Sequence, residues 1–261
     1  MRFASLGSGS QGNGTLIEWS DGALLLDCGF SMKEAELRLA RLERSPRDLS
    51  ALLVTHEHGD HIKGIAAMAR RYQLPVYMTP GTYHSRDLGV IPQLRLIEGY
   101  RAFRIGSLEV EPVPVPHDAR EPSQFIFCSD GIKFGVLTDL GSISPHVEER
   151  YCDCDALLLE ANHDPVMLAS GPYPPSLKQR VGGAWGHLSN QQTAGFLARV
   201  DTDKLQALVI AHISQKNNSL AAARAVLDPV TQSVARVQYA CQDEGFGWIQ
   251  LRAPLTSAAL A

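Results

Sequence analysis

The sequence predicts an α/β fold in which two β-sheets are covered by helices. Apolar segments of strand length recur along the chain and alternate with longer segments of helical periodicity. The strand-like segments fall into two sets, which favours two sheets. With 261 residues and no internal repeat, low-complexity tract or linker, the chain has the length of a single α/β domain, so we expect one domain over residues 1–261.

The first elements are expected to be a β-hairpin and then a helix. Residues 15–19 and 23–27 are strand-like and flank a Ser-Asp-Gly turn. Ser31 and Glu34 have the spacing of a capping box, which predicts a helix over 33–44. Further strands are expected at 74–78, within 101–115 around a turn at Gly106, and at 124–129, 132–138, 156–160, 207–211, 234–240 and 247–251, with further helices at 62–72, 145–151, 190–200 and 220–227.

The N-terminal sequence GSGSQG, residues 7–12, matches the glycine fingerprint of dinucleotide-binding proteins. That fingerprint needs a helix directly after it, because the pyrophosphate lies at the helix N-terminus. Here the predicted hairpin follows instead. Dinucleotide binding is therefore not expected.

Composition indicates an ordinary globular protein. The first residues lack the apolar stretch of a signal peptide, and no run approaches the roughly 18 apolar residues that span a bilayer. Five cysteines without regular spacing suit a reducing compartment, and Cys152 and Cys154 are expected to be structural. We therefore expect a cytoplasmic protein without membrane contact. Because the net charge is −4, any nucleic-acid contact has to be local.

Possible metal ligands occur repeatedly at the ends of strand-like runs. In α/β folds, ligands bind in the crevice beyond the carboxyl ends of the strands. We therefore expect these side chains to line one such crevice. They are His56 after ALLV, His117 after VEPVPVP, Asp139 after FGVLT, Glu160 at the end of ALLLE and His212 after ALVIA.

The sequence THEHGDH holds the densest cluster, His56, His58, Asp60 and His61. Four ligand-type residues in six positions have no packing purpose, so the cluster predicts metal binding. Alternate residues of an extended loop point the same way, so the first two histidines are expected to face one ion and the last two residues a second. One loop cannot complete either coordination shell. The additional ligands are expected to be His117, Asp139 and His212.

Together these motifs resemble those of the metallo-β-lactamase fold, a four-layer αββα sandwich with a one- or two-metal site between the sheet edges. THEHGDH is similar to the signature H-x-H-x-D-H, and LLLDCG, VPHDA, LTDLG and VIAHIS are similar to the first, third, fourth and fifth motifs, in order. The resemblance covers nearly the whole chain. The combination of SLGSGSQGN, THEHGDH, LEANHD, GHLSN and IAHIS most resembles the small bacterial WalJ/YycJ-type branch, described as exonuclease-like.

The resemblance implies a ligand set. One ion would take His56, His58 and His117, a second would take Asp60, His61 and His212, and Asp139 would bridge them. Asp27 would support the histidine loop by fixing an imidazole. The best-known zinc β-lactamases carry cysteine where this chain has Asp139, so antibiotic hydrolysis is not expected. The two divalent ions are expected to be zinc or manganese, with iron as a further candidate.

LEAN and GHLSN resemble paired motifs of the tRNA 3′-end endonuclease branch. The resemblance implies that Glu160 orients His187, which protonates the leaving group of a phosphodiester, while Asp60 also accepts a hydrogen bond from the attacking water. The stretch between Asp139 and His212 has no room for the large inserted domain of RNA-processing relatives. The expected substrate is therefore nucleic acid, and single-stranded DNA in particular; the oligomeric state is left open.

Two polar groups are candidates for substrate contacts. Ser8 and Asn13 in the glycine-rich turn can offer donors to a phosphate, and Lys178 and Arg180 can add positive charge near His187. The alternative is that the turn is only a tight entry to the hairpin and that the basic pair is solvated surface.

Three other functions stay open. A phosphodiesterase acting on a small cyclic or nucleotide substrate would use the same residues. A glyoxalase-type thioester hydrolase would share the histidine loop without the Glu160/His187 pair. A metal-stabilised binding protein would hydrolyse nothing, and the complete ligand set argues against it. The remaining histidines, His84, His146 and His163, lack a partner motif and are expected to be structural.

Overall fold

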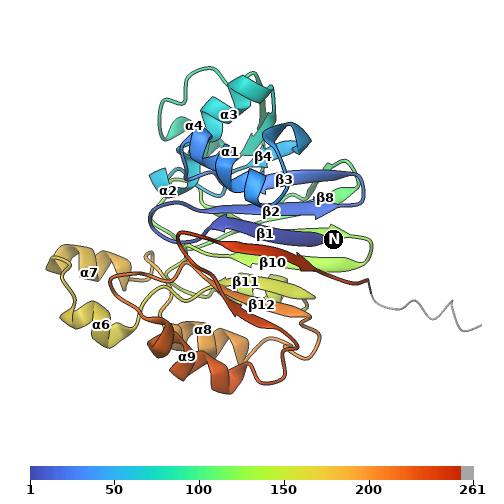
Figure 1. Cartoon of the computed structure of the whole chain (residues 1–261). Coiled ribbons are helices and arrows are strands. Elements are labelled where there is room, and N and C mark those ends of the chain that lie inside the picture. The colour runs from blue at the N-terminus through green and yellow to red at the C-terminus, as the bar shows by residue number, and fades with distance from the viewer. Residues whose placement is uncertain (254–261) are drawn as a thin grey trace, which may run out of the picture.

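The computed structural model describes residues 1–253, and within them two seven-stranded sheets pack between layers of helices (Figure 1). The first sheet has the order β14 (Phe246–Gln250), β1 (Arg2–Gly7), β2 (Gly14–Trp19), β3 (Gly22–Leu26), β4 (Ala51–Leu53), β5 (Pro75–Met78) and β6 (Gln93–Leu96). The second sheet has the order β13 (Val237–Tyr239), β12 (Ala207–Ala211), β11 (Ala156–Glu160), β10 (Ile132–Leu137), β9 (Ser123–Ser129), β8 (Leu108–Pro114) and β7 (Phe103–Ile105).

Helices form the two outer layers. Beside the first sheet are α1 (Met32–Arg41), η1 (Pro46–Asp48), α2 (Gly59–Ile62), α3 (Ile65–Tyr72) and α4 (Pro80–His84). Between β10 and β13 the chain forms α5 (Pro145–Tyr151), α6 (Pro165–Ser170), α7 (Pro175–Val181), α8 (Asn190–Leu197), α9 (Leu220–Leu227) and η2 (Asp228–Val230). Figure 1 shows α1 and α3 above the sheets and α8 and α9 below them, which confirms the four-layer αββα sandwich.

Three apolar clusters hold the layers together. The central cluster fills the space between the sheets, where the rings of Phe3 and Phe134 stack with centroids 4.1 Å apart. A second cluster joins the first sheet to its helices through residues such as Leu39 and Met68, and a third does the same for the second sheet. Each buried side chain of this size stabilises the fold by roughly 1.5–3 kcal/mol.

Each sheet has an antiparallel half and a parallel half. In the first, β3, β4, β5 and β6 run parallel; in the second, β10, β11, β12 and β13 do so. Parallel neighbours direct their carboxyl ends to the same edge of a sheet. The segments that follow β3, β4, β10 and β12 carry the predicted site residues Asp27, His56 to His61, Asp139 and His212, and Glu160 is the last residue of β11.

Several elements differ from their expected bounds. The helix capped by Ser31 ends at Arg41, because Glu43 adopts a left-handed backbone with φ 57°. The helix expected over 62–72 is divided into α2 and α3 at Gly64, where a Cβ atom would lie 2.4 Å from the Phe30 carbonyl oxygen. Strands β1 and β6 and the short helices α4, α6 and α7 were not anticipated. These three helices have only five to seven residues, too few for a clear helical periodicity.

Among the described residues, no helix has the length and apolar character needed to cross a bilayer.

Candidate metal centre

The structure brings the predicted ligands together at the edge where the parallel strands end. Their donor atoms form overlapping groups within 4.8 Å of one another: His56, His58 and His117; Asp60, His61 and His212; and His56, His61 and Asp139. Residues separated by more than 150 positions in the chain therefore meet in one site. A fourth group, Asp139, Glu160, His187 and His212, adjoins them.

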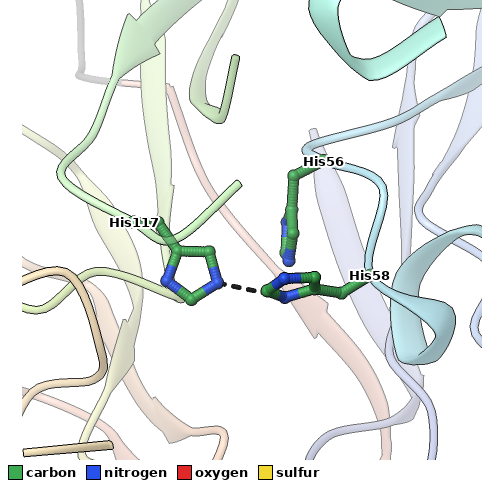
Figure 2. Close-up of side chains that lie close together, drawn as sticks. All are labelled: His56, His58 and His117. Carbon is green, nitrogen blue, oxygen red and sulfur yellow. Dashed lines mark hydrogen bonds between the residues drawn. The ribbon is translucent and has the colours of Figure 1, made fainter. Parts of the chain in front are cut away.

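The first group is formed by three imidazoles that face a common point (Figure 2). Nε2 of His117 lies 3.2 Å from Nδ1 of His58, and the ring centroid of His56 is 4.6 Å from that of His58. Two imidazole nitrogens bound tetrahedrally to one zinc ion at about 2.0–2.1 Å would lie about 3.3 Å apart. The spacing fits two ligands of one ion.

The second group is built around the carboxylate of Asp60. Its Oδ2 atom lies 3.6 Å from Nε2 of His61 and 3.7 Å from Nε2 of His212. Asp139 lies between the two groups, because its Oδ2 atom is 3.4 Å from Nε2 of His61 and it also belongs to the cluster that contains His56. This is the position that a bridging carboxylate requires.

Buried polar atoms without a partner test whether these residues fit a metal ion. Within residues 1–253, ten buried side-chain atoms have no hydrogen-bond partner, and three of them gather at this site: Nε2 of His56, Oδ2 of Asp139 and Nε2 of His212. An unsatisfied buried polar atom costs roughly 1–3 kcal/mol, and native proteins keep few of them. All three belong to predicted ligands, so the donor set fits a divalent cation.

Electrostatics favour the metal-binding protonation state at His56, His117 and Asp139. They oppose it at His61 and His212: against the effect of burial, the neighbouring carboxylates, Asp139 above all, raise the pKa of His61 well above its ordinary value and that of His212 to about 10, so a metal ion has to displace a proton from each. Burial lowers the pKa of His56 well below its ordinary value and that of His117 to about 4, so both imidazoles are neutral donors. Burial alone would raise the pKa of Asp139, but the imidazoles of His212 and His61 hold it well below its usual range. Neutral imidazole and ionised carboxylate are the forms that coordinate metals.

Asp27 and Thr55 orient two of the histidines from behind. Oδ2 of Asp27 lies 2.8 Å from Nδ1 of His61 and accepts a hydrogen bond from Oγ1 of Thr55, also at 2.8 Å. The Thr55 hydroxyl lies 2.9 Å from Nδ1 of His56. Because Nδ1 of each imidazole is engaged, Nε2 is left for the cleft. Gly29 allows the loops to approach, since a Cβ atom there would lie 1.7 Å from the Asp60 carbonyl oxygen.

Glu160 orients two imidazoles, not one. Its Oε1 atom lies 2.8 Å from Nδ1 of His187 and 2.9 Å from Nδ1 of His212, and its Oε2 atom accepts from the backbone of Leu188 at 2.9 Å. Burial would raise the pKa of this fully buried carboxyl, but the two histidines lower it to about 2. The sequence predicted the contact with His187 and missed the one with His212. An ionised Glu160 therefore links the metal ligands to the predicted proton donor.

Three of these residues have a left-handed backbone that non-glycine residues rarely adopt. The φ angles are 61° for Asp27, 55° for Asp139 and 53° for His212. Each follows the end of a parallel strand, and the turn directs its side chain into the site. Such conformations cost roughly 1–3 kcal/mol each and persist only where the surroundings enforce them.

This strain predicts an unusual order of stability. In metal-free protein, His212→Gly should have a free energy of unfolding about 1 kcal/mol higher than His212→Ala, because glycine adopts positive φ without penalty. At Glu36, inside α1, the order should be reversed by a similar amount. Urea unfolding of the four variants measures both differences. A lower stability of His212→Gly than of His212→Ala would contradict the assignment of strain.

Several of the predicted ligands line a cleft of about 320 Å³, called here the metal cleft. Its walls include Asp60, Asp139, His187 and His212, together with Asp118, Tyr173 and Arg180. His187 is partly exposed at this cleft, with 20% of its side chain accessible. Apart from its place next to His117, Asp118 had no recognisable pattern in the sequence, and Tyr173 had none at all.

The four predicted substrate contacts lie in different places. Arg180 lines the metal cleft and forms an ion pair with Asp118, whereas Nζ of Lys178 donates to the Ala169 carbonyl at 2.6 Å and does not line it. Oγ of Ser8 is buried and accepts from the His212 backbone at 2.9 Å. Nδ2 of Asn13 lies 3.3 Å from Oδ2 of Asp60 and 3.0 Å from Nε2 of His61.

His163 and the pair Cys152 and Cys154 were predicted to have structural roles. His163 is buried, and its backbone pairs with Ser189 at the entry to α8. Burial lowers the pKa of His163. All five cysteines are free, and Cys154 is buried in the core of the second sheet.

Comparison with known proteins agrees with this fold and site. Residues 23–213 match the family model described as "Beta-lactamase superfamily domain", and the chain belongs to that superfamily. It is 36% identical over 251 residues to exodeoxyribonuclease YycJ of Bacillus anthracis, covering 95% of this chain and 91% of the relative. It is also 36% identical over 223 residues to exodeoxyribonuclease WalJ of Streptococcus pneumoniae, covering 83% of each. The predicted WalJ/YycJ-type branch is thereby confirmed.

A solved structure shares the fold at low identity. The Zn²⁺-bound PqqB of Methylobacterium extorquens matches with a TM-score of 0.73 and 16% identity, covering 96% of this chain and 100% of that chain. Together with the unpartnered ligand atoms, membership of the superfamily supports the binding of divalent metal in the metal cleft.

Proposed function

We propose that this protein is a cytoplasmic metal-dependent phosphodiester hydrolase that degrades single-stranded DNA as an exonuclease. One observation carries the proposal: a carboxylate-oriented histidine, His187, lies at the metal cleft beside a complete ligand set, in a chain similar to two exodeoxyribonucleases. The five free cysteines are in keeping with a reducing compartment.

Two divalent ions, zinc, manganese or iron, would be held by the seven ligands. His56, His58 and His117 would hold one, Asp60, His61 and His212 the other, and Asp139 both. When bound, such ions supply Lewis acidity that activates water and neutralises charge on a phosphate. The chain itself provides the orientation, through Asp27, Thr55 and Glu160.

His187 would move a proton. Its Nδ1 atom donates to Oε1 of Glu160, so Nε2 is the ring nitrogen that can deliver a proton to the departing oxygen. The ionised carboxylate fixes the orientation and the tautomer of the imidazole. Asp60 would also accept a hydrogen bond from the attacking water, as the sequence predicts.

Other residues of the metal cleft would place the substrate. The guanidinium of Arg180 is held by Asp118 at the cleft wall, where it can contact a phosphate oxygen. Ser8 and Asn13 would act mainly by holding His212 and Asp60, with the glycine-rich turn around them as part of the substrate surface. Lys178 would add only longer-range positive charge.

A comparison of substrates tests the proposal. Protein reconstituted separately with zinc, manganese and iron is incubated with end-labelled single-stranded DNA, with bis-p-nitrophenyl phosphate and with a glutathione thioester. We expect progressive shortening of the DNA from one end and no thioester hydrolysis. Turnover of the small diester without any DNA degradation would favour a small-substrate phosphodiesterase, and thioester hydrolysis would favour a glyoxalase-type enzyme. Bound metal without hydrolysis of any ester would indicate a binding protein.

A further inference from the structure

A second and larger hollow adjoins the metal cleft. It has a volume of about 620 Å³ and is walled by α2, α3 and the loop after α4. Ser10, Gly59 and Asp60 line both hollows, so the two open into each other. Gly59 has no side chain, and a Cβ atom placed there would have no other atom within 4 Å. The junction between the two hollows is therefore open at this position.

Positive charge is concentrated in this second hollow. Lys63, Arg70 and Arg86 line it, against the carboxylates of Asp60, a predicted metal ligand, and Asp87. Three cations against two carboxylates leave one net positive charge in the hollow, in a protein whose net charge is −4. We call the hollow the basic trough.

Two of the three cations are free to bind a ligand. Nine of the 24 lysines and arginines have a carboxylate within ion-pair distance, as Arg180 does with Asp118. Within residues 1–253, Lys63 and Arg86 have no carboxylate within ion-pair distance. Unpaired cations that line a hollow are suited to phosphate oxygens.

Arg70 fixes the wall of the trough. Its guanidinium donates to the carbonyl oxygens of Leu88 at 3.0 Å and Val90 at 3.2 Å, which ties the loop that carries Arg86 to α3. The side chain of Asp87 accepts from the backbone of Gly89 at 2.8 Å, within the same loop. The loop is therefore held in place, and Arg86 lines the trough without a conformational change.

We propose that the basic trough binds the backbone phosphates of a nucleic-acid strand on one side of the phosphate that occupies the metal cleft. The inference rests on the proposed function, because it extends the substrate from one phosphodiester to a polyanionic strand. Lys63 and Arg86 contact the phosphates, and Arg70 positions the loop. The trough gives the enzyme its preference for a chain over a single diester.

Binding to a cleavage-resistant strand tests this directly. Fluorescence anisotropy of a labelled phosphorothioate oligonucleotide of roughly twenty nucleotides is measured with metal-loaded wild-type protein and with Lys63→Gln/Arg86→Gln. Loss of two phosphate contacts should raise Kd roughly tenfold at low salt and reduce the slope of log Kd against log salt by about 1.4. The shift for a dinucleotide, which cannot extend along the trough, should be several-fold smaller.

The matched control is Arg101→Gln/Arg236→Gln. It removes the same charge from two exposed positions outside the metal cleft and the basic trough. An equal loss of affinity in both double variants would overturn the inference, and so would an equal loss for the dinucleotide and the long strand. Because binding is measured without cleavage, failure of the trough is distinguishable from failure of the proposed nuclease activity, which the substrate comparison detects.

Discussion

Asp139→Asn is expected to lower kcat/KM for single-stranded DNA by about 10³-fold, which corresponds to roughly 4 kcal/mol of transition-state stabilisation. Asn keeps the shape of the side chain but removes the charge that lies between the two ligand groups, next to His61 and His212. Elemental analysis of the purified variant should show less bound metal than wild type. Assays with labelled DNA measure the activity, and elemental analysis measures the metal content independently.

Asp130→Asn is the matched control. Asp130 also follows a strand and has a left-handed backbone, with φ 53°, but it lies in the turn between β9 and β10. Its replacement should leave metal content and activity at wild-type levels. Wild-type activity in Asp139→Asn, or equal losses in the two variants, would show that Asp139 is not a metal ligand.

His187→Gln is expected to separate substrates by their leaving groups. Cleavage of DNA, whose departing alkoxide needs a proton, should slow by about 10²–10⁴-fold in kcat. Hydrolysis of bis-p-nitrophenyl phosphate should change far less, because p-nitrophenolate departs without protonation. Steady-state kinetics on both substrates provide the measurement. Equal losses on the two substrates would contradict a role in protonation.

Glu160→Gln provides a contrast to that experiment. Its carboxylate contacts both His187 and the metal ligand His212, so both substrates should be affected. His84→Gln, at the exposed end of α4, should affect neither. The three variants together distinguish proton delivery from ligand positioning.

The sequence was sufficient to predict which ligand-type residues meet in one place, because they lie at or just after strand ends. THEHGDH concentrates four of them, and His117, Asp139 and His212 each follow an apolar run. Parallel strands direct their carboxyl ends to one edge, so residues far apart in the chain could be expected to meet there. The strand pattern itself predicted two sheets covered by helices, and the family resemblance implied the four-layer sandwich.

Contacts between loops could not be predicted in this way. The sharing of Glu160 between His187 and His212 depends on the register of β11 against β12, where Glu160 lies opposite Ala211. The ion pair of Arg180 with Asp118 joins α7 to the loop after β8, and neither short segment has a clear pattern. The basic trough likewise arises from α2, α3 and a distant loop, whose cations are unremarkable in sequence.

The left-handed backbone at Asp27, Asp139 and His212 has a consequence for how this chain can change over evolutionary time. Two predicted metal ligands and a residue that positions a third are held in conformations that oppose folding, whereas the cores between and outside the sheets do not depend on them. Glycine at such a position removes the chemistry while relieving strain. A chain with glycine at one of these positions is therefore expected to keep the same sandwich without the proposed hydrolysis.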